Sequence, residues 1–315
     1  MAEIALALGG GGIKGIAHVG VIKVLEREGF KISAVAGTSV GGIIGSLLCA
    51  GYRSTDMMQT VERLKSPHFF SRSPFDGPSL MGVQGGIRVL EDYLGNRQFQ
   101  DLPIPFACTA VDLNTSQEII LAHGRVIDAV LATIAIPGIF PPRQANNYVL
   151  VDGGVLDPVP VSLARWLAPT SPVIAVCLTP APEGWATLPD PHVPPVTPIP
   201  RPILNQVARL RIGQAFQIFI KSIDATSRMV AELRLQIEKP EVIIRPDVAK
   251  FGILDDASLI DTNEIVALGE AAAEAALPQI RQALSWSNQL SRFFRHTTPP
   301  GKVLGVDENH SPQQS

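Results

Sequence analysis

Residues 31–51 read KISAVAGTSVGGIIGSLLCAG, and this stretch decides the fold of the chain. Its first seven residues form an apolar run that suits a short buried strand. The residues after Ser39 are apolar and rich in glycine, which suits a helix packed on a sheet. Between the two, Gly37-Thr38-Ser39-Val40-Gly41 has the form G-x-S-x-G, the sharp strand-to-helix turn that exposes a nucleophilic serine. This context predicts that Ser39 is a nucleophile at a helix N-terminus, where backbone amides favour negative charge.

A second glycine motif lies near the N-terminus. Residues 4–15 read IALALGGGGIKG, so that a predicted strand runs directly into four consecutive glycines. Residues 16–30, IAHVGVIKVLEREGF, place apolar side chains at helical spacing and predict a helix that ends at Gly29. A run of glycines at such a turn exposes several backbone N–H groups to one small anionic atom.

Three kinds of anion site compete for this loop. A phosphate-binding loop of the form G-x-x-x-x-G-K-[ST] fails, because no Lys-Ser/Thr pair follows Gly15. A dinucleotide fingerprint fits Gly10, Gly12 and Gly15, but the next predicted strand lacks the terminal acidic residue that a ribose needs. An oxyanion hole formed by the amides of Gly10, Gly11 and Gly12 and aimed at Ser39 uses both glycine motifs at once. A simple tight turn needs fewer glycines than four.

The third motif is Asp152-Gly153-Gly154. It follows NNYVLV (146–151), which predicts a turn and a short strand with Asp152 at its C-terminal end. Catalytic groups gather at the C-terminal ends of strands in open α/β sheets. The competing interpretation is an Asp-Gly hairpin turn, which would be preferred if this motif stood alone.

Taken together, the three motifs resemble the patatin-like phospholipases, a family of lipid acyl hydrolases, over roughly residues 4–170. Weaker support comes from ATIAIPGIFPP (132–142), and TAVDLNTSQEIIL (109–121) is similar to a strand pair in the middle of the family's domain. The family usually has arginine where this chain has Lys14, which keeps the charge but loses the planar fork. The order strand, glycine loop, helix, strand, serine turn and helix predicts a three-layer α/β/α fold with a mostly parallel central sheet.

The resemblance also implies a Ser-Asp dyad with no histidine between the two residues. Asp152 would accept the Ser39 proton as the hydroxyl attacks an ester carbonyl, and would then activate the water that releases the fatty acid. A free aspartate has a pKa of about 3.9 and is a weak base, so partial burial has to raise its pKa. The implied site residues are Ser39 and Asp152 for catalysis, Gly10, Gly11 and Gly12 for the oxyanion hole, and, in support, Lys14, Gly15, Gly37, Gly41, Gly153 and Gly154.

Composition limits the other classes of function. The 315 residues can bury a large core, and a net charge of −3 argues against nucleic-acid binding. Cys49, Cys108 and Cys177 are far apart in apolar contexts, which predicts buried thiols in a reducing compartment and hence a cytoplasmic protein. The N-terminal apolar run follows no basic segment and predicts a first strand, not a signal peptide, and no transmembrane span is predicted.

No metal and no cofactor are expected. The three cysteines lack the spacing of metal ligands, and the six histidines are scattered, so each histidine is interpreted as a surface or core residue. His123 is the one to follow, because it precedes the ATIAIP segment near the predicted site. No histidine is predicted to be the catalytic base.

The C-terminal half is expected to complete the domain. A catalytic core over 1–178 would end in a buried parallel strand, VIAVCL (173–178), followed by a proline-rich connector or lid at 179–202. Residues 203–237 predict one long helix or two shorter ones that cover the sheet, with a membrane-facing amphipathic helix as the alternative. The remaining predictions are a last strand at 241–247, an alanine-rich helix at 263–284 that closes the region 203–296, and a disordered tail at 297–315.

The function favoured by the sequence is hydrolysis of fatty-acyl esters of phospholipids or lysophospholipids by Ser39 and Asp152. The partner would be a lipid substrate, with peripheral contact at a membrane surface as an option. An acyltransferase or thioesterase could use the same acyl-serine, and a nucleotide-binding module could use Gly10, Gly12 and Gly15. An interaction protein that keeps the motifs without turnover is the third alternative.

Overall fold

The structure is a computed structural model that describes residues 3–64, 71, 79–187, 206–253, 255, 259–285, 292 and 297–304. The strands are β1 (Glu3–Leu8), β2 (Lys31–Gly37), β3 (Phe106–Asp112), β4 (Gln117–Leu121), β5 (Arg143–Ala145), β6 (Tyr148–Asp152), β7 (Val173–Val176), β8 (Val242–Ile244) and β9 (Lys302–Val303). The α-helices are α1 (Ala17–Arg27), α2 (Val40–Cys49), α3 (Ser54–Leu64), α4 (Gln84–Leu94), α5 (Val126–Thr133), α6 (Val161–Leu167), α7 (Gln206–Glu238) and α8 (Thr262–Ala283).

The strands form one mixed sheet that is mostly parallel. Strands β3, β2, β1, β7 and β8 are neighbours in that order, and each of these pairs is parallel. Strands β4 and β6 are antiparallel to β3, and β5 is antiparallel to β6. The predicted mostly parallel sheet is therefore confirmed, with an antiparallel region around β3.

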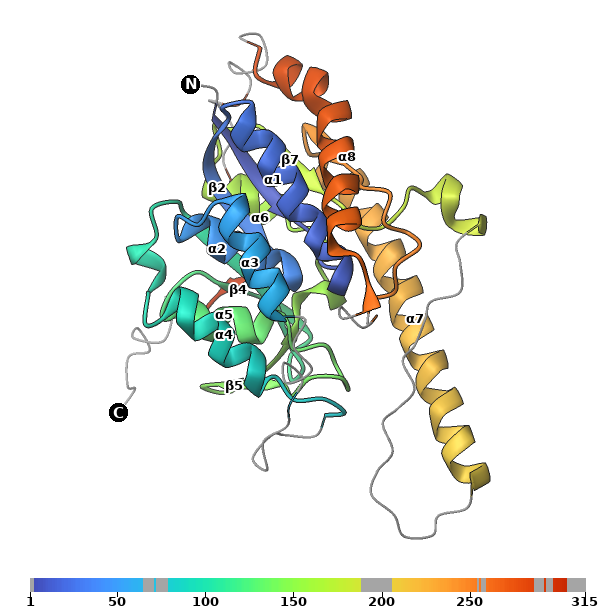
Figure 1. Ribbon diagram of the computed structural model, residues 1–315. Helices are drawn as coiled ribbons and strands as arrows, with labels where there is room; N and C mark the ends of the chain where they lie inside the picture. Colours follow the sequence, from blue (N-terminus) through green and yellow to red (C-terminus); the bar gives the residue numbers. More distant parts are fainter. Residues whose placement is uncertain are drawn as a thin grey trace, which may run out of the picture.

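Helices cover both faces of the sheet, as Figure 1 shows, and the side chains of β1 explain how. Ile4, Leu6 and Leu8 lie on one face, in the large core cluster that includes residues of α1 to α5 and α8. Ala5 and Ala7 lie on the other face, in a smaller cluster with residues of α6 and the C-terminal half of α7. Alternation along a strand sends successive side chains to opposite faces, and the small alanines allow α6 to pack closely. The predicted three-layer α/β/α arrangement is confirmed.

Strands β2 and β6 lie on the same edge of β3. Both β4 and β6 pair with residues 110–112, so they occupy opposite edges of β3. Both β2 and β4 pair with Cys108, so they too occupy opposite edges. Strand β2 therefore runs along residues 106–108 and β6 along residues 110–112 of one edge, in opposite directions. Their C-terminal ends, which carry the serine and aspartate motifs, meet beside Thr109.

The C-terminal half differs from the prediction in its details. Residues 206–238 form a single helix, α7, whose N-terminal turns project away from the rest of the molecule (Figure 1). The strand at 242–244 is not the last one, because Lys302–Val303 pairs with β4 in the tail that was expected to be disordered. Part of the proline-rich segment, residues 182–187, is a short 3-10 helix. The rest of that segment, residues 188–202, and the tail from residue 305 onwards lie outside the described residues.

Candidate active site

Ser39 occupies a strained turn between β2 and α2. Its backbone angles are φ 54° and ψ −126°, a region that non-glycine residues rarely adopt, and its side chain is buried. The Ser39 N–H donates to Thr133 Oγ1 at 3.0 Å, and the preceding Thr38 N–H donates to the Leu8 carbonyl at 3.0 Å. The predicted sharp turn from strand to helix, the serine elbow, is thus present at the N-terminus of α2, and its backbone groups are hydrogen-bonded to α5 and β1.

Close backbone contacts explain the glycines around Ser39. A Cβ atom at Gly41 would lie 2.1 Å from the Leu8 carbonyl oxygen, and one at Gly37 would lie 2.5 Å from the Gly41 carbonyl oxygen. A Cβ atom at Gly15 would lie 2.3 Å from the Val40 side chain. Since real Cβ atoms do not approach so closely, these glycines let the elbow pack against the strand end and the glycine loop.

Asp152 lies beside Ser39 and is almost completely buried. Its Oδ1 accepts the Gly154 N–H at 2.7 Å, and its own N–H donates to the Ala135 carbonyl at 2.9 Å. Burial raises the pKa of the Asp152 carboxyl to about 6, and the Ser39 hydroxyl and the Gly154 N–H offset part of this rise in the pKa by hydrogen bonding to the carboxylate. The carboxylate is therefore poised to exchange a proton near neutral pH.

Thr109 of β3 joins the two motifs. Its Oγ1 lies 3.1 Å from Thr38 Oγ1, next to the nucleophile. On the other side, a Cβ atom at Gly153 would lie 2.0 Å from Thr109 Oγ1, so only glycine fits after the aspartate. Asp152 lies at the C-terminal end of its strand, as predicted, although β6 is antiparallel to β3. Strand β3 extends beyond Cys108, its last residue that pairs with β2. Strand β6 pairs with this extension, which brings Asp152 to the site.

The glycine loop lies against Ser39, but its amides are not equivalent. A Cβ atom at Gly10 would lie 3.2 Å from Ser39 Cβ. The Gly10 N–H donates to the Pro158 carbonyl at 2.9 Å, so this amide, one of the three predicted oxyanion donors, already has an acceptor within the protein. Among the described residues, no acceptor is present for the N–H groups of Gly11 and Gly12. Two of the three predicted donors therefore have no acceptor in the part of the chain that the structure describes.

Lys14 follows this loop and is buried. Burial lowers the pKa of its ammonium group, an effect that the carboxylates of Asp224 and Asp255 oppose and the Arg228 guanidinium reinforces. Asp224 and Arg228 belong to α7, where they form an ion pair at 3.1 Å. The charged side of the site is therefore shared between the glycine loop and α7, a contribution that the sequence motifs did not indicate.

The histidines in the described residues occupy two different environments. His123 is exposed in the turn after β4. Strand β4 is antiparallel to β3 and leads the chain away from Thr109, where Ser39 and Asp152 meet, so His123 is not part of the site. His18 is fully buried in α1 and lies 2.8 Å from the Gly9 carbonyl oxygen. His68, His192, His296 and His310 lie outside the described residues.

The described part of the chain contains neither a cluster of metal ligands nor a helix that could span a membrane. It contains no group of three or more His, Cys, Asp and Glu side chains placed to hold a metal ion. Cys49, Cys108 and Cys177 are buried free thiols. None of the helices there combines the length and the hydropathy that a membrane span requires.

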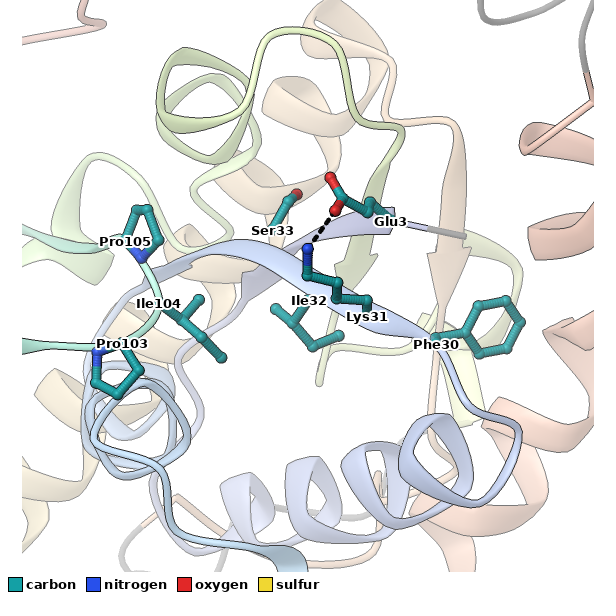
Figure 2. A pocket seen from close by; sticks show the side chains of 8 residues that line it. All are labelled: Glu3, Phe30, Lys31, Ile32, Ser33, Pro103, Ile104 and Pro105. Atoms are coloured by element: carbon teal, nitrogen blue, oxygen red, sulfur yellow. Dashed lines mark hydrogen bonds and ion pairs between the residues drawn. The ribbon is translucent and has the colours of Figure 1, made fainter. Parts of the chain in front are cut away.

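A hollow of about 570 Å³ lies at the other end of the sheet (Figure 2). Its polar groups are already paired: Lys31 forms an ion pair with Glu3, and Ser33 Oγ lies within hydrogen-bond distance of the Ile4 carbonyl oxygen and of Ser171 Oγ. It lies at the start of β1, whereas the glycine loop follows its end, so the two are separated by roughly 16 Å of strand. We assign no part of the chemistry to this hollow, which is lined by Glu3, Phe30, Lys31, Ile32, Ser33, Pro103, Ile104 and Pro105.

Sequence reasoning missed several residues that hold the site. Thr133 lies within ATIAIPGIFPP, but only the structure shows that its hydroxyl accepts the Ser39 N–H. Asp112 accepts the Val149 N–H at 2.9 Å and two hydrogen bonds from Thr115, which fixes β6 against the β3–β4 hairpin. A buried Asp at a strand end before Asn-Thr-Ser is a recognisable turn signal, whereas the threonines carry no signal of their own.

The fold and the site define an α/β protein with a serine elbow, a glycine loop and a buried aspartate. A sequence model described as patatin-like phospholipase matches residues 6–165. The chain therefore belongs to the patatin-like phospholipase family, as its motifs predicted.

Curated relatives are similar over part of the chain. An uncharacterised NTE family protein of Mycobacterium tuberculosis is 33% identical over 170 residues, which are 51% of this chain and 45% of that protein. A second one from the same species is 31% identical over 292 residues, 87% of this chain and 46% of that protein. Lysophospholipase NTE1 of Eremothecium gossypii is 32% identical over 168 residues, 50% of this chain and 11% of that protein. The chain thus spans less than half the length of these relatives.

Among solved structures, VipD from Legionella pneumophila matches 89% of this chain and 67% of its own chain, with 13% identity and a TM-score of 0.48. The type III effector protein ExoU matches 95% of this chain and 55% of its own, with 15% identity and a TM-score of 0.37.

Proposed function

We propose that the protein is a serine acyl hydrolase that cleaves fatty-acyl esters of phospholipids or lysophospholipids. Asp152 accepts the proton of the Ser39 hydroxyl as Oγ attacks the ester carbonyl, and a tetrahedral oxyanion forms. Its collapse breaks the bond to the alcohol, which takes the proton and leaves, and the acyl group remains on Ser39. Water, deprotonated by Asp152, then releases the fatty acid.

The observation that carries this proposal is the buried pairing of Ser39 with Asp152. A carboxylate with a pKa of about 6 is a far better base at neutral pH than a free aspartate, because burial destabilises its charged form. No third titratable group is needed between the two. The strained Ser39 backbone supports a functional role, since strain of this kind persists where the surrounding structure holds it for a purpose.

The oxyanion is assigned to the amides of Gly11 and Gly12 and to the N-terminus of α2. Gly10 is left out because its N–H is already used. Each well-aimed amide in such a site contributes about 3 kcal/mol to the transition state. The packing of Gly15 on Val40 also favours this role over dinucleotide binding, since it aims the loop at the elbow.

Lysophospholipids are the first substrates to test, because one similar protein carries the name lysophospholipase. The purified chain and its Ser39→Ala variant are incubated with lysophospholipids and diacylphospholipids, and mass spectrometry follows free fatty acids and acylated acceptors. We expect fatty acid from the wild type and none from Ser39→Ala. Release by both proteins alike, or by neither while both are folded, would contradict the proposal. An acylated acceptor in place of fatty acid would indicate a transferase.

A further inference from the structure

His18 makes a buried contact that the proposed dyad does not use. Its Nε2 lies 2.8 Å from the Gly9 carbonyl oxygen, and its side chain is fully buried in α1. A carbonyl oxygen only accepts hydrogen bonds, so Nε2 carries the proton and donates it. The other ring nitrogen, Nδ1, has no partner among the described residues. The imidazole is therefore kept dry and neutral for a single hydrogen bond.

That bond fixes one peptide group of the glycine loop from both sides. The Gly9 carbonyl and the Gly10 N–H belong to the same planar peptide unit. The carbonyl accepts from His18, and the N–H donates to the Pro158 carbonyl at 2.9 Å. The next two N–H groups along the chain are those of Gly11 and Gly12, the proposed oxyanion donors. The orientation of the Gly9–Gly10 peptide therefore determines where the following N–H groups, those of Gly11 and Gly12, can point.

Four consecutive glycines would otherwise leave this loop free to rotate. Glycine populates both signs of φ with nearly equal ease, so a peptide in such a run can turn over at little cost. Donors stabilise an oxyanion well only when they already point at the place where charge develops. A loop that serves this chemistry therefore needs an anchor outside the glycines, and in this structure the side chain that contacts the Gly9 carbonyl is His18.

We propose that His18 is a positioning residue: through the Gly9 carbonyl it holds the Gly9–Gly10 peptide so that the Gly11 and Gly12 amides face the oxyanion formed on Ser39. This inference rests on the proposed function. His18 is not the catalytic base, because Nδ1, the ring nitrogen that could accept a proton, has no hydrogen-bond partner among the described residues. Burial also lowers the pKa of the imidazole to about 4, which leaves it uncharged near neutral pH.

The test compares replacements that differ in one property. In His18→Gln, the amide nitrogen takes the place of Nε2 and can donate to the Gly9 carbonyl. His18→Asn has the same chemistry on a side chain one methylene shorter, which does not reach, and His18→Met fills the space without a donor. Each is assayed for kcat and KM, for its melting temperature, and for affinity toward an alkyl trifluoromethyl ketone, which forms an oxyanion when a serine adds to it.

We expect His18→Met and His18→Asn to lose about 10²-fold in kcat with little change in KM, the pattern of an interaction made only in the transition state. Their affinity for the ketone should fall in parallel, and His18→Gln should stay within about tenfold of the wild type. Folded Met or Asn variants with wild-type kcat would overturn the proposal. So would undiminished ketone affinity in a variant whose kcat falls.

Two further comparisons deal with variants that do not fold and separate the role of His18 from the proposed function. If His18→Met and His18→Asn do not fold, His18→Gln decides, because a folded Gln variant with a hundredfold loss of kcat contradicts a role that needs only the donor. Ser39→Ala is assayed beside them. Full activity of Ser39→Ala would refute the proposed function itself, whereas an inactive Ser39→Ala with unaffected His18 variants refutes only the role of His18.

Discussion

Ser39 and Asp152 approach each other from opposite directions along one edge of β3. The strand before Ser39 runs parallel to β3, and the strand that ends in Asp152 runs antiparallel to it. The two side chains meet beside Thr109, whose hydroxyl contacts Thr38. This head-on arrangement lets a serine and an aspartate pair directly, without a histidine to bridge two parallel strand ends.

The pH dependence of activity should report the buried carboxyl. Asp152 must be deprotonated to accept the serine proton, and its pKa is raised to about 6. We therefore expect kcat/KM to rise with pH through about 6 and then to level off. A profile measured with a soluble ester from pH 3.5 to 8 checks this. An acid limb at pH 4, the range of an ordinary aspartate, would show that Asp152 is not the base.

The same buried charge should weaken the fold above its pKa. Well below pH 3.8 the carboxyl is protonated in the folded and unfolded states alike. The stability cost develops as the pH rises from about 3.8 and is complete above pH 6, where the folded state also has to bury a carboxylate. A pKa rise to about 6 corresponds to about 3 kcal/mol of lost stability at pH 8, as an upper estimate. Asp152→Asn removes that cost, so this inactive variant should be more stable than the wild type at pH 8 and close to it in stability at pH 4.

Urea unfolding at the two pH values measures this difference. Asp128→Asn, on the exposed face of α5, serves as the control and should not produce it. If Asp152→Asn were less stable than the wild type at pH 8, the carboxylate would be contributing favourable contacts that outweigh its burial.

Two substitutions of Ser39 separate chemistry from strain. Both Ser39→Ala and Ser39→Gly should be inactive, since neither has a hydroxyl. Alanine keeps the unfavourable φ of 54°, whereas glycine adopts it without cost. Ser39→Gly should therefore have a free energy of unfolding about 1 kcal/mol higher than that of Ser39→Ala, after the entropy cost of glycine is subtracted. Denaturant unfolding of the two variants measures this difference. Equal stabilities would mean that the elbow is not strained.

Much of this arrangement follows from the sequence. The serine turn, the glycine loop, the aspartate motif and the helices α1, α2, α7 and α8 were predicted from apolar spacing and turn residues, because those signals are local. Other features depend on contacts between distant segments. These are the direction of β6, the hydrogen bond from the Gly10 N–H to the Pro158 carbonyl, and the pairing of Lys302–Val303 with β4. Single polar residues such as Thr133 and His18 carry no local pattern, so their roles appear only once the chain is folded.

Gly11 and Gly12 should respond differently to substitution, although both are proposed oxyanion donors. A Cβ atom at Gly12, where φ is 58°, would lie 2.0 Å from the Ile253 carbonyl oxygen. At Gly11, where φ is 157° and also unfavourable for alanine, the nearest atom would be Leu178 Cδ1 at 3.0 Å, the end of a flexible side chain. Both substitutions strain the backbone, but only Gly12→Ala also forces Cβ against a backbone oxygen, so it should lose about 1–2 kcal/mol more stability than Gly11→Ala. Gly11→Ala, with fold retained and kcat lowered, is then the usable test of the loop, and similar melting temperatures for the two variants would contradict this.

The most direct measurement is mass-spectrometric mapping of the adduct that an alkyl fluorophosphonate forms with the wild type, Ser39→Ala, Asp152→Asn and His123→Ala. A serine activated by Asp152 alone gives one adduct, on the peptide that contains Ser39, in the wild type and in His123→Ala. It gives none at that position in Ser39→Ala and only slow labelling in Asp152→Asn. A folded wild type that stays unlabelled would contradict a nucleophilic Ser39 and favour a binding module. Labelling lost in folded His123→Ala would replace the dyad with a triad.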